Sequence, residues 1–451
     1  MTAIVTSKFR VVNASNFKQD ITSVDNSVYV FIGKSDAWSE SVTDLVDGIA
    51  PTPQDTSRDI AETYKNLIAG KIVTTSDVTH VVPRYDWTSG NAYTAWNDQD
   101  PEIFTKQFYV LTDERKLFKC LKAGPSSSIV KPTLAQVPPD QTGGDGYVWK
   151  YMYTLAIVDA EKFLTNFYVP VKTVVLPAGG IGSLSESDLA QYTNQQSSIS
   201  TLQGRIYDIR VSAGGSGYTS ATATIVGDGT GATATVQVSG GVVTGLTVTD
   251  AGQDYNIATV VITGDGTEAA AYPVMSPPYG HGSDPVNELG GYYVGVNVRL
   301  EYDDGLGDFI VENNFRQIGL IKNPMDASGS TVASDTTING LSTIQLVNGT
   351  GFTTGDYITG TTSGSIAYID EWDEVNLTIK FHQNNKTGYG VFTNGEAIDG
   401  SLGGTGSLAS SNAISNPEYT PFSGQIIFLE NRDPINRSAS QIEDVKVIIE
   451  F

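Results

Sequence analysis

One short segment contains the residue types of a serine hydrolase. His281, Ser283 and Asp284 lie in the string YGHGSDP, and a hydroxyl nucleophile, an imidazole base and an orienting carboxylate are what nucleophilic acyl transfer requires. These groups must lie in line, which is difficult for residues one to three positions apart in a turn rich in glycine and proline. The other histidines, His80 and His382, lie in separate parts of the chain. We therefore predict an ordinary loop.

Acidic residues suggest two further kinds of chemistry. Asp228 and Asp265 lie in matching Gly-Asp-Gly-Thr strings, but a calcium site needs about six to eight oxygen ligands, which this spacing does not supply. Aspartate and glycine favour tight turns, so turn formation is the simpler interpretation. Another acidic group could pair as acid and base for sugar hydrolysis, although such a run is more commonly the solvated end of a hairpin. That group is Asp370, Glu371, Asp373 and Glu374.

The remaining motifs favour structure over chemistry. The glycines at 141–146 in QTGGDGY lack the following Lys-Ser or Lys-Thr of a phosphate loop, and a strand-like YVWKYMY replaces the helix. Cys120 lies in the alternating string KLFKCLK without an adjacent histidine, as an ordinary strand residue would. Scattered tryptophans could form a sugar-binding platform, but they are more often core or interface anchors. They are Trp38, Trp87, Trp96 and Trp149. We expect no enzyme, no cofactor and no metal site.

Composition argues against several classes of partner. The 451 residues include 50 acidic and 27 basic ones, a net charge of -23, which repels nucleic acid because binding there depends on lysine and arginine displacing counterions. The single cysteine excludes an internal disulfide framework and a thiolate-rich zinc site. The N-terminus lacks a signal-peptide pattern, and no window approaches the roughly 18 apolar residues of a membrane span. We expect a soluble protein kept in cytosol-like conditions, without nucleic acid or membrane partners.

Strand patterns dominate the chain. Continuous apolar runs at 28–32, 426–429 and 445–449 predict buried strands, and we expect the last to pair with strands from the N-terminal half. Helical spacing is found at 57–70 and 159–167. With 47 glycines and 18 prolines separating short segments, the chain is predicted to be mainly β, a β-rich α+β fold with antiparallel sheets and a few short helices.

Two long stretches are rich in glycine and threonine and poor in lysine, and each contains an internal repeat. In the first, eight positions recur at an offset of 37, including Tyr218 and Tyr255, which we expect to be exposed. In the second, five positions recur at an offset of 40, among them Asp356 and Glu396. Because duplicated units can cover each other's apolar faces, each stretch is predicted to be a small β-module.

The predicted organisation is a host fold interrupted twice. The host occupies 1–204, 276–326 and 417–451, and the inserted modules occupy 205–275 and 327–416. A host can carry such insertions because the free energy of loop closure rises only by about 0.6 kcal/mol for each doubling of loop length.

The host segments, taken in chain order, resemble the baseplate wedge protein family, gene product eight, of contractile-tailed phages of the T-even type. The resemblance extends from the first residues to the last and rests on the order of the motifs rather than on any single one. The motifs are AIVTSKFR at 3–10, FIGKSDAWS at 31–39, VPRYDW at 82–87, GDGYVWKY at 144–151, NNFRQIGLIKNP at 313–324, SGQIIFLENRDPI at 423–435 and VKVIIEF at 445–451.

This resemblance implies a non-enzymatic virion protein of the tail baseplate, assembled in the host cytoplasm. The protein would be a homodimer that holds neighbouring wedge proteins of the same phage together during tail assembly and contraction. The glycine-rich repeats look like β-modules in structural proteins of phages that infect marine cyanobacteria, which points to a cyanophage version. An alternative stays open: a virion glycan-binding or adhesive protein that acts through the inserted modules.

Nine residues in or beside these motifs are candidates for protein interfaces or for defining the fold. Interface cores favour tryptophan, tyrosine and arginine over lysine and glutamate. The candidates are Phe9, Arg10, Trp38, Trp87, Trp149, Phe315, Arg316, Asn431 and Arg432.

Overall fold

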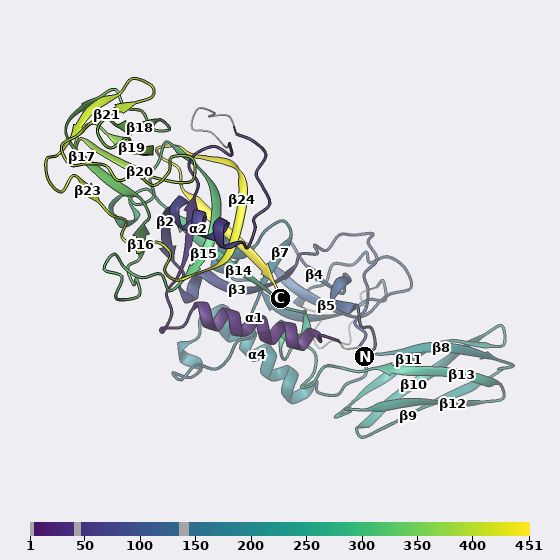
Figure 1. The fold of residues 1–451 in the computed structure, drawn as a ribbon. Helices are drawn as coiled ribbons and strands as arrows, with labels where there is room; N and C mark the ends of the chain where they lie inside the picture. Colours follow the sequence, from purple (N-terminus) through teal and green to yellow (C-terminus); the bar gives the residue numbers. More distant parts are fainter. Residues whose placement is uncertain (1–3, 40–46, 135–143) are drawn as a thin grey trace. The chain divides into compact units, whose positions relative to one another are not determined.

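The computed structural model describes residues 4–39, 47–134 and 144–451 (Figure 1). Strands account for 41% of the chain and helices for 15%, and several of the sheets are antiparallel, which confirms the predicted fold class. The chain divides into two compact units, which are described separately. Unit 1 comprises Met1–Asn16, Thr79–Gly295 and Ile448–Phe451, and unit 2 comprises Phe17–Val78 and Val296–Val447.

Unit 1 contains a three-stranded antiparallel sheet in the order β4-β5-β6 and the antiparallel pair β3–β7. Helix α1 begins in this unit and continues into unit 2. Outside the first module, the helices and strands are α1 (Ser7–Ile21), β3 (Val78–Pro83), β4 (Tyr109–Leu111), β5 (Lys116–Lys122), β6 (Val148–Thr154), α3 (Ile157–Phe163), β7 (Tyr168–Val171), α4 (Glu186–Thr201) and α5 (Pro285–Glu288).

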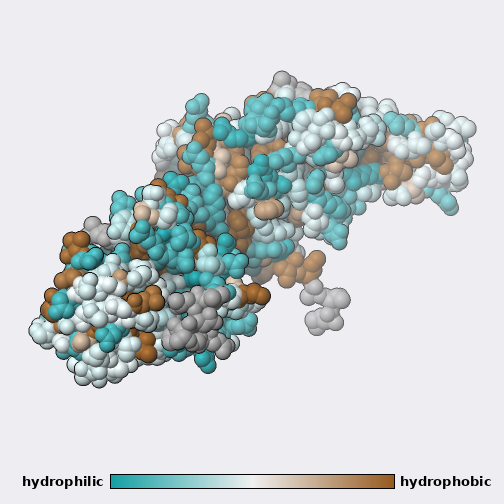
Figure 2. All heavy atoms as spheres, turned by 90° about the horizontal axis from the view of Figure 1, so that it is seen from above, coloured by the Kyte–Doolittle hydropathy of each residue, from teal (hydrophilic) through white to brown (hydrophobic). Residues whose placement is uncertain are grey.

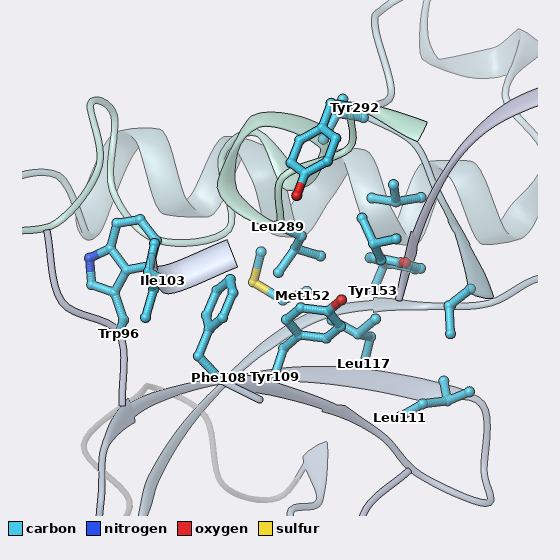
Figure 3. Close-up of a cluster of buried hydrophobic side chains, with 14 of the residues drawn as sticks. Trp96, Ile103, Phe108, Tyr109, Leu111, Leu117, Met152, Tyr153, Leu289 and Tyr292 are labelled. Carbon is cyan, nitrogen blue, oxygen red and sulfur yellow. The ribbon is translucent and has the colours of Figure 1, made fainter. Parts of the chain in front are cut away.

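The core of unit 1 covers both faces of the β4-β5-β6 sheet. All five inner residues of β5 are buried, although its sequence alternates lysine with apolar residues. One cluster packs around Phe108, Met152 and Leu289, as Figure 3 shows. A second cluster contains Cys120 and Trp149. Burial on both faces explains why Cys120 is an inaccessible strand residue, and burial also raises the pKa of its thiol.

The first module is a ring of six strands in the order β8, β13, β12, β9, β10, β11. The strands are hydrogen-bonded in three antiparallel pairs, and the pairs pack against one another around the ring. Thr224 pairs with Val261, which lies 37 positions later, so a local two-fold axis relates the two sequence repeats. The strands are β8 (Asp208–Ser216), β9 (Ala221–Gly227), β10 (Thr230–Ser239), β11 (Val242–Gln253), β12 (Ala258–Gly264) and β13 (Thr267–Val274).

Unit 2 contains a five-stranded antiparallel sheet in the order β16-β2-β1-β15-β24. Every residue of β1 is buried, as its continuous apolar run predicts. Tyr29 and Phe31 of β1 pack into a cluster with Tyr64 and Ile321. The helix and strands are β1 (Val28–Gly33), α2 (Ser57–Asn66), β2 (Leu67–Ile72), β15 (Asn313–Lys322), β16 (Thr337–Asn339) and β24 (Gln425–Arg437).

The second module has a seven-stranded sheet and its own apolar cluster, which extends from Ile344 to Ala413. Thr359 pairs with Asp399, 40 positions later, so a local two-fold axis relates these repeats too. Residues 337–339, within the second predicted insertion, form β16 and pair with β2. The module's strands are β17 (Ser342–Thr350), β18 (Tyr357–Gly360), β19 (Ile366–Asp373), β20 (Thr378–His382), β21 (Ala397–Gly400), β22 (Thr405–Leu408) and β23 (Ile414–Ser415).

The C-terminal strand β25 (Glu443–Glu450) lies beside β14 (Tyr293–Leu300), and both strands run from one unit into the other. The prediction that this strand pairs directly with strands of the N-terminal half is therefore wrong. The N-terminal contact is made by α1, whose Arg10 guanidinium donates to the carbonyl oxygen of Phe451 and lies 2.5 Å from the Glu450 carboxylate.

Two long helices, α1 and α4, were not predicted from the sequence. In α4 the buried positions are polar: Gln191 and Gln195 hydrogen-bond to backbone groups of the segment after β7, so the apolar spacing of a surface helix is absent. The two predicted helices do form, but α2 and α3 are shorter than their patterns. None of the helices within the described ranges combines the length and apolar character needed to cross a membrane.

Candidate functional site

The loop around His281 does not form a catalytic triad. The Ser283 hydroxyl donates to the carbonyl oxygen of Gly280 at 2.8 Å. The Asp284 carboxylate caps α5, where it accepts from the backbone N–H of Asn287 at 3.3 Å. The nucleophile, base and orienting group therefore do not lie in line, in keeping with their sequence spacing.

His281 instead belongs to a buried polar cluster of unit 1. Its Nδ1 atom lies 4.0 Å from the carboxylate of Glu288, and Glu288 pairs with Lys119 at 2.9 Å, with both side chains buried. The Lys119 ammonium lies 3.8 Å from the centroid of the Trp96 ring. Burial, together with the charges of Lys119 and Lys150, holds the pKa of His281 well below its usual range. This cluster holds the loop against β5. Lys119 and Glu288 are far apart in the sequence, so no local pattern could predict that they meet.

Each Gly-Asp-Gly turn of the first module supports the turn that precedes a strand of the opposite repeat. Asp228 accepts from the backbone N–H groups of Ile257 at 3.0 Å and Asn256 at 2.8 Å, while Asp265 accepts from the backbone N–H of Thr219 at 2.9 Å. The hydrogen bonds from the Ile257 backbone and from Asn256 lower the pKa of Asp228 to about 2. Those from the Thr219 hydroxyl and the neighbouring backbone N–H groups lower the pKa of Asp265 to about 2. Each carboxylate thus fixes a turn of the opposite repeat, which agrees with the turn interpretation.

The second module uses the same arrangement. Asp356 accepts from the backbone N–H of Leu402 at 3.0 Å, and Glu396 accepts from that of Ser363 at 2.8 Å. Burial raises the pKa of Glu396, but hydrogen bonds from Ser363 and its neighbours outweigh it and lower the pKa. Among the residues that the structure describes, no group of three or more histidine, cysteine, aspartate and glutamate side chains is arranged to hold a metal ion.

The acidic run at 370–374 is not a solvated hairpin end throughout, so that prediction is wrong for Asp370. Asp370 is fully buried and lies 2.7 Å from Nδ1 of His382 on the adjacent strand β20. Glu371 pairs with another residue of β20, Lys380, at 3.0 Å. Asp373 accepts from backbone N–H groups of the turn between the strands, and Glu374 is exposed in that turn, as predicted for a solvated hairpin end.

A buried ion cluster surrounds this pair in unit 2. Asp36, which follows β1, accepts from Lys34 at 2.8 Å, lies 3.4 Å from Nε2 of His382 and contacts the ammonium of Lys386. Burial lowers the pKa of His382, but Asp370 and Asp36 outweigh it and raise the pKa to about 9. Two buried carboxylates therefore hold three cationic side chains, and they connect the module to the segment after β1.

Tyr218 and Tyr255 are buried, each about 5% exposed, so the prediction that they are exposed is wrong. Their rings pack where the glycines of the turns leave room: a Cβ atom added at Gly229 would lie 2.5 Å from the Tyr255 ring, and one at Gly266 would lie 2.5 Å from the Tyr218 ring. The glycan-binding alternative loses the exposed aromatic side chains that motivated it.

Three of the nine candidate residues lie in the interior, and a fourth, Trp87, is partly buried. Trp149 and Phe315 are buried apolar side chains, and Trp87 packs against the cluster that contains Trp149. Arg316 is buried and binds the Asp47 carboxylate through two hydrogen bonds of 2.6 and 2.7 Å. The structure thus places these side chains where they hold the fold.

Four others hold loops or chain ends within one unit. The guanidinium of Arg10, besides its contacts with the C-terminus, lies 3.7 Å from the centroid of the Tyr292 ring. The indole N–H of Trp38 donates to the carbonyl oxygen of Arg432 at 2.8 Å. The Asn431 side chain donates to the carbonyl oxygen of Pro51 at 2.9 Å. The side chain of Arg432 itself is exposed.

Phe9, the ninth candidate, belongs to an exposed apolar face of α1. At about 100° per residue, Phe9 and Val12 lie on the side of the helix opposite to Val11 and Ala14, which are buried. Val5, which lies just before the helix, is exposed as well. The exposed fractions are 65% for Val5, 55% for Phe9 and 52% for Val12. Figure 2 shows that apolar side chains reach the surface in separate patches. The face of α1 belongs to a helix that is apolar on both sides, which explains why the sequence showed no helical pattern here.

Unit 2 also contains a cleft of about 480 Å³, here called the aromatic cleft. It lies between α2, the segment at 416–421 and the end of β20 with the loop that follows. Its aromatic and proline lining consists of Tyr64, Phe381, Tyr389, Phe392, Pro417, Tyr419 and Pro421, and Lys65 is its lysine.

Comparison with known proteins gives two matches, both to one phage protein family. Residues 3–105 match the family model described as bacteriophage T4 Gp8. The chain is 27% identical over 206 residues to baseplate wedge protein gp8 of Enterobacteria phage T4, an alignment that covers 38% of this chain. The chain spans 60% of the length of that relative. The N-terminal host segment, with α1 and β1 to β3, is thus similar in sequence to phage baseplate protein Gp8.

Proposed function

We propose that this protein is a structural, non-enzymatic subunit of the baseplate wedge of a contractile phage tail. The similarity of residues 3–105 to the Gp8 family and the 27% identity to a baseplate wedge protein support this role. The structural observation that carries it is the exposed apolar face of α1, because this face lies within the matched residues.

A helix with a second apolar face is suited to packing against another protein. Exposed apolar side chains that gather on one face mark interaction sites more often than singly scattered ones do. No acidic residue occurs between Ile4 and Gln19, so this face lacks the negative charge that dominates a chain of net charge -23. Its few side chains cover less than the roughly 800 Å² per partner of a standard interface. The face therefore suits one contact among several, as in a multi-protein wedge.

The finer parts of the proposal concern assembly. We infer that the protein is a homodimer that holds neighbouring wedge proteins together while the tail assembles in the host cytoplasm and later contracts. The order of the seven family-like motifs supports this inference, and the two repeat modules support a cyanophage origin. In this proposal the modules at 205–275 and 327–416 are insertions, and the host segments make the contacts with other wedge proteins.

The test is complementation of a phage that lacks this protein with a Phe9→Asp variant. A charge at the centre of the α1 face should remove a contact of about 2 kcal/mol, a roughly 30-fold loss of affinity, and baseplates should lack the subunit. Circular dichroism should show an unchanged fold, because Phe9 is exposed. Val375→Asp is the matched control, since Val375 is 90% exposed in a turn of unit 2.

Two results would contradict the proposal. One is normal incorporation of the Phe9→Asp variant into baseplates. The other is electron cryomicroscopy of the wild-type virion that places this chain outside the baseplate.

A further inference from the structure

The aromatic cleft of unit 2 has the features of a binding site for a chain segment. Its volume of about 480 Å³ lies within the range of roughly 300 to 1,000 Å³ that ligand sites occupy. Five tyrosine and phenylalanine rings and two prolines are among the residues that line it. Such linings bind extended, proline-containing or apolar peptide segments, which offer little else than shape and apolar surface.

The rim of the cleft is apolar as well. Val391 is 80% exposed, and Tyr389 and Phe422 are each exposed over half or more of their surface. The Phe422 ring also contacts the ring of Tyr64, at a centroid distance of 5.9 Å. A cleft with aromatic rings in its wall and an exposed apolar rim favours a partner that covers both together.

Among the polar side chains that line the cleft, the cation of Lys65 gives it a preference for a negatively charged ligand. Lys65 lies in the last turn of α2, and its ammonium group is 5.8 Å from the centroid of the Tyr389 ring and 5.4 Å from that of Phe422. Within the described part of the chain, no carboxylate forms an ion pair with it, although acidic residues outnumber basic ones by 50 to 27. Burial lowers the pKa of this ammonium group. A carboxylate brought by a ligand would therefore find an unpaired cation on an apolar surface.

The tyrosine hydroxyls argue against a sugar as the occupant. The hydroxyl of Tyr64 donates to the carbonyl oxygen of Gly424 at 3.0 Å, and that of Tyr419 donates to the carbonyl oxygen of Tyr64. The hydroxyl of Tyr389 donates to the side-chain oxygen of Asn385 at 3.1 Å. Sugar recognition needs several polar groups that point into the site, and here they are engaged within the protein.

From this combination we propose that the aromatic cleft binds an apolar segment of another protein chain that carries a carboxylate, with the carboxylate beside Lys65 and apolar side chains between the rings. Nucleic acid is a poor alternative, because one lysine on a chain of net charge -23 cannot hold a phosphate backbone. The inference does not depend on the baseplate role, since it follows from the cleft alone. It would give the second module a function, because this module supplies one wall.

The experiment screens a library of random decapeptides against the purified full-length chain. Bound peptides should share an aspartate, a glutamate or a free C-terminal carboxylate next to aromatic, aliphatic or proline residues. Lys65→Gln should weaken the best of them roughly tenfold, as expected for loss of one charge-assisted contact. Changing the peptide's acid to its amide should have the same effect. Lys131→Gln, which alters a partly exposed lysine of unit 1, is the matched control and should bind normally.

Several outcomes would overturn the proposal. They are the absence of any binding peptide, selected peptides without an acid, or equal binding by the wild type and Lys65→Gln. If Lys65→Gln fails to fold, Val391→Ser, which changes an exposed rim residue, replaces it and should also weaken binding. None of these results bears on whether the protein lies in a baseplate, which the complementation experiment tests separately.

Discussion

The buried ion cluster of unit 2 allows a sharp test of the structure. In Asp36→Asn the side chain keeps its size but loses its charge, so Lys34, His382 and Lys386 retain only Asp370 as a buried counter-charge. A buried cation without its partner strongly destabilises the fold, because it has lost its hydration and no ion pair compensates for that loss. We expect unit 2 to be destabilised selectively.

The expected loss is about 3 to 5 kcal/mol, the usual cost of removing one partner from a buried pair. Asp36 is fully buried, as are His382 and Asp370 to within a few per cent, so solvent screening does not reduce the effect. A matched surface change, Asp113→Asn, should leave the stability almost unchanged, because Asp113 pairs with Lys131 in an exposed ion pair of 2.8 Å.

Hydrogen exchange measured by mass spectrometry as a function of urea suits this test, because two units need not unfold together. Amides of β1, β19 and β20 should lose protection at lower urea in Asp36→Asn, while amides of β4, β5 and β6 in unit 1 serve as the internal control. A loss of stability under 1 kcal/mol in β19 and β20, or an equal loss in both units, would refute the reasoning.

The same cluster predicts a pH dependence of the wild type. Because the pKa of His382 is raised from 6.5 to about 9, its contribution is complete below pH 6.5 and is lost as pH rises through 9. Burial raises the pKa of Asp36, but His382 and Lys34 outweigh it and hold the pKa well below 3.8, so its contribution is present above pH 3.8 and lost at lower pH. Protection of β20 should therefore be greatest between about pH 4 and 6.5. A maximum above pH 9 would contradict this assignment.

Three further changes follow from the fold. The urea midpoint of the first module should fall equally in Asp228→Asn and Asp265→Asn, since each carboxylate supports a turn of the other repeat. Unequal effects in hydrogen exchange would disprove the symmetry. The wild-type module should also lose stability as pH falls from 3.8 towards 2. Trp149→Ala should lower the free energy of unfolding, measured with urea, by about 3 to 5 kcal/mol. Trp149→Phe should lower it much less, because the indole N–H makes no hydrogen bond to any described residue. Deletion of 445–451 should leave insoluble protein in an expression test, because β14 loses its neighbour; a soluble, folded product would show that β25 is dispensable.

Local patterns predicted the strands better than the helices. The apolar run at 28–32 is β1, and the repeats at offsets of 37 and 40 correspond to two modules with local two-fold axes. Helix α1 escaped prediction because Phe9 and Val12 are apolar on its exposed side, which removes the contrast between faces. Helix α4 escaped it because its buried face carries glutamines.

The polar clusters could not be predicted because their members are distant in sequence. Asp36 and His382 are separated by more than 340 positions, and Lys119 and Glu288 by 169. Only the register of β19 with β20 brings Asp370 beside an imidazole, and a run of acids normally indicates a solvated surface. Lys65 and the aromatic cleft depend likewise on how α2 and the second module meet within unit 2.

The exchange of turn-fixing carboxylates between repeats has a consequence for how such modules are inherited. If a chain lost one repeat, the turn of the other repeat would lack the carboxylate that fixes it, and the central strand would lack its antiparallel partner. A single repeat is therefore not expected to fold stably. Selection must therefore keep or remove the two copies together. Each module is a single inherited unit, in which neither repeat can be lost without the other.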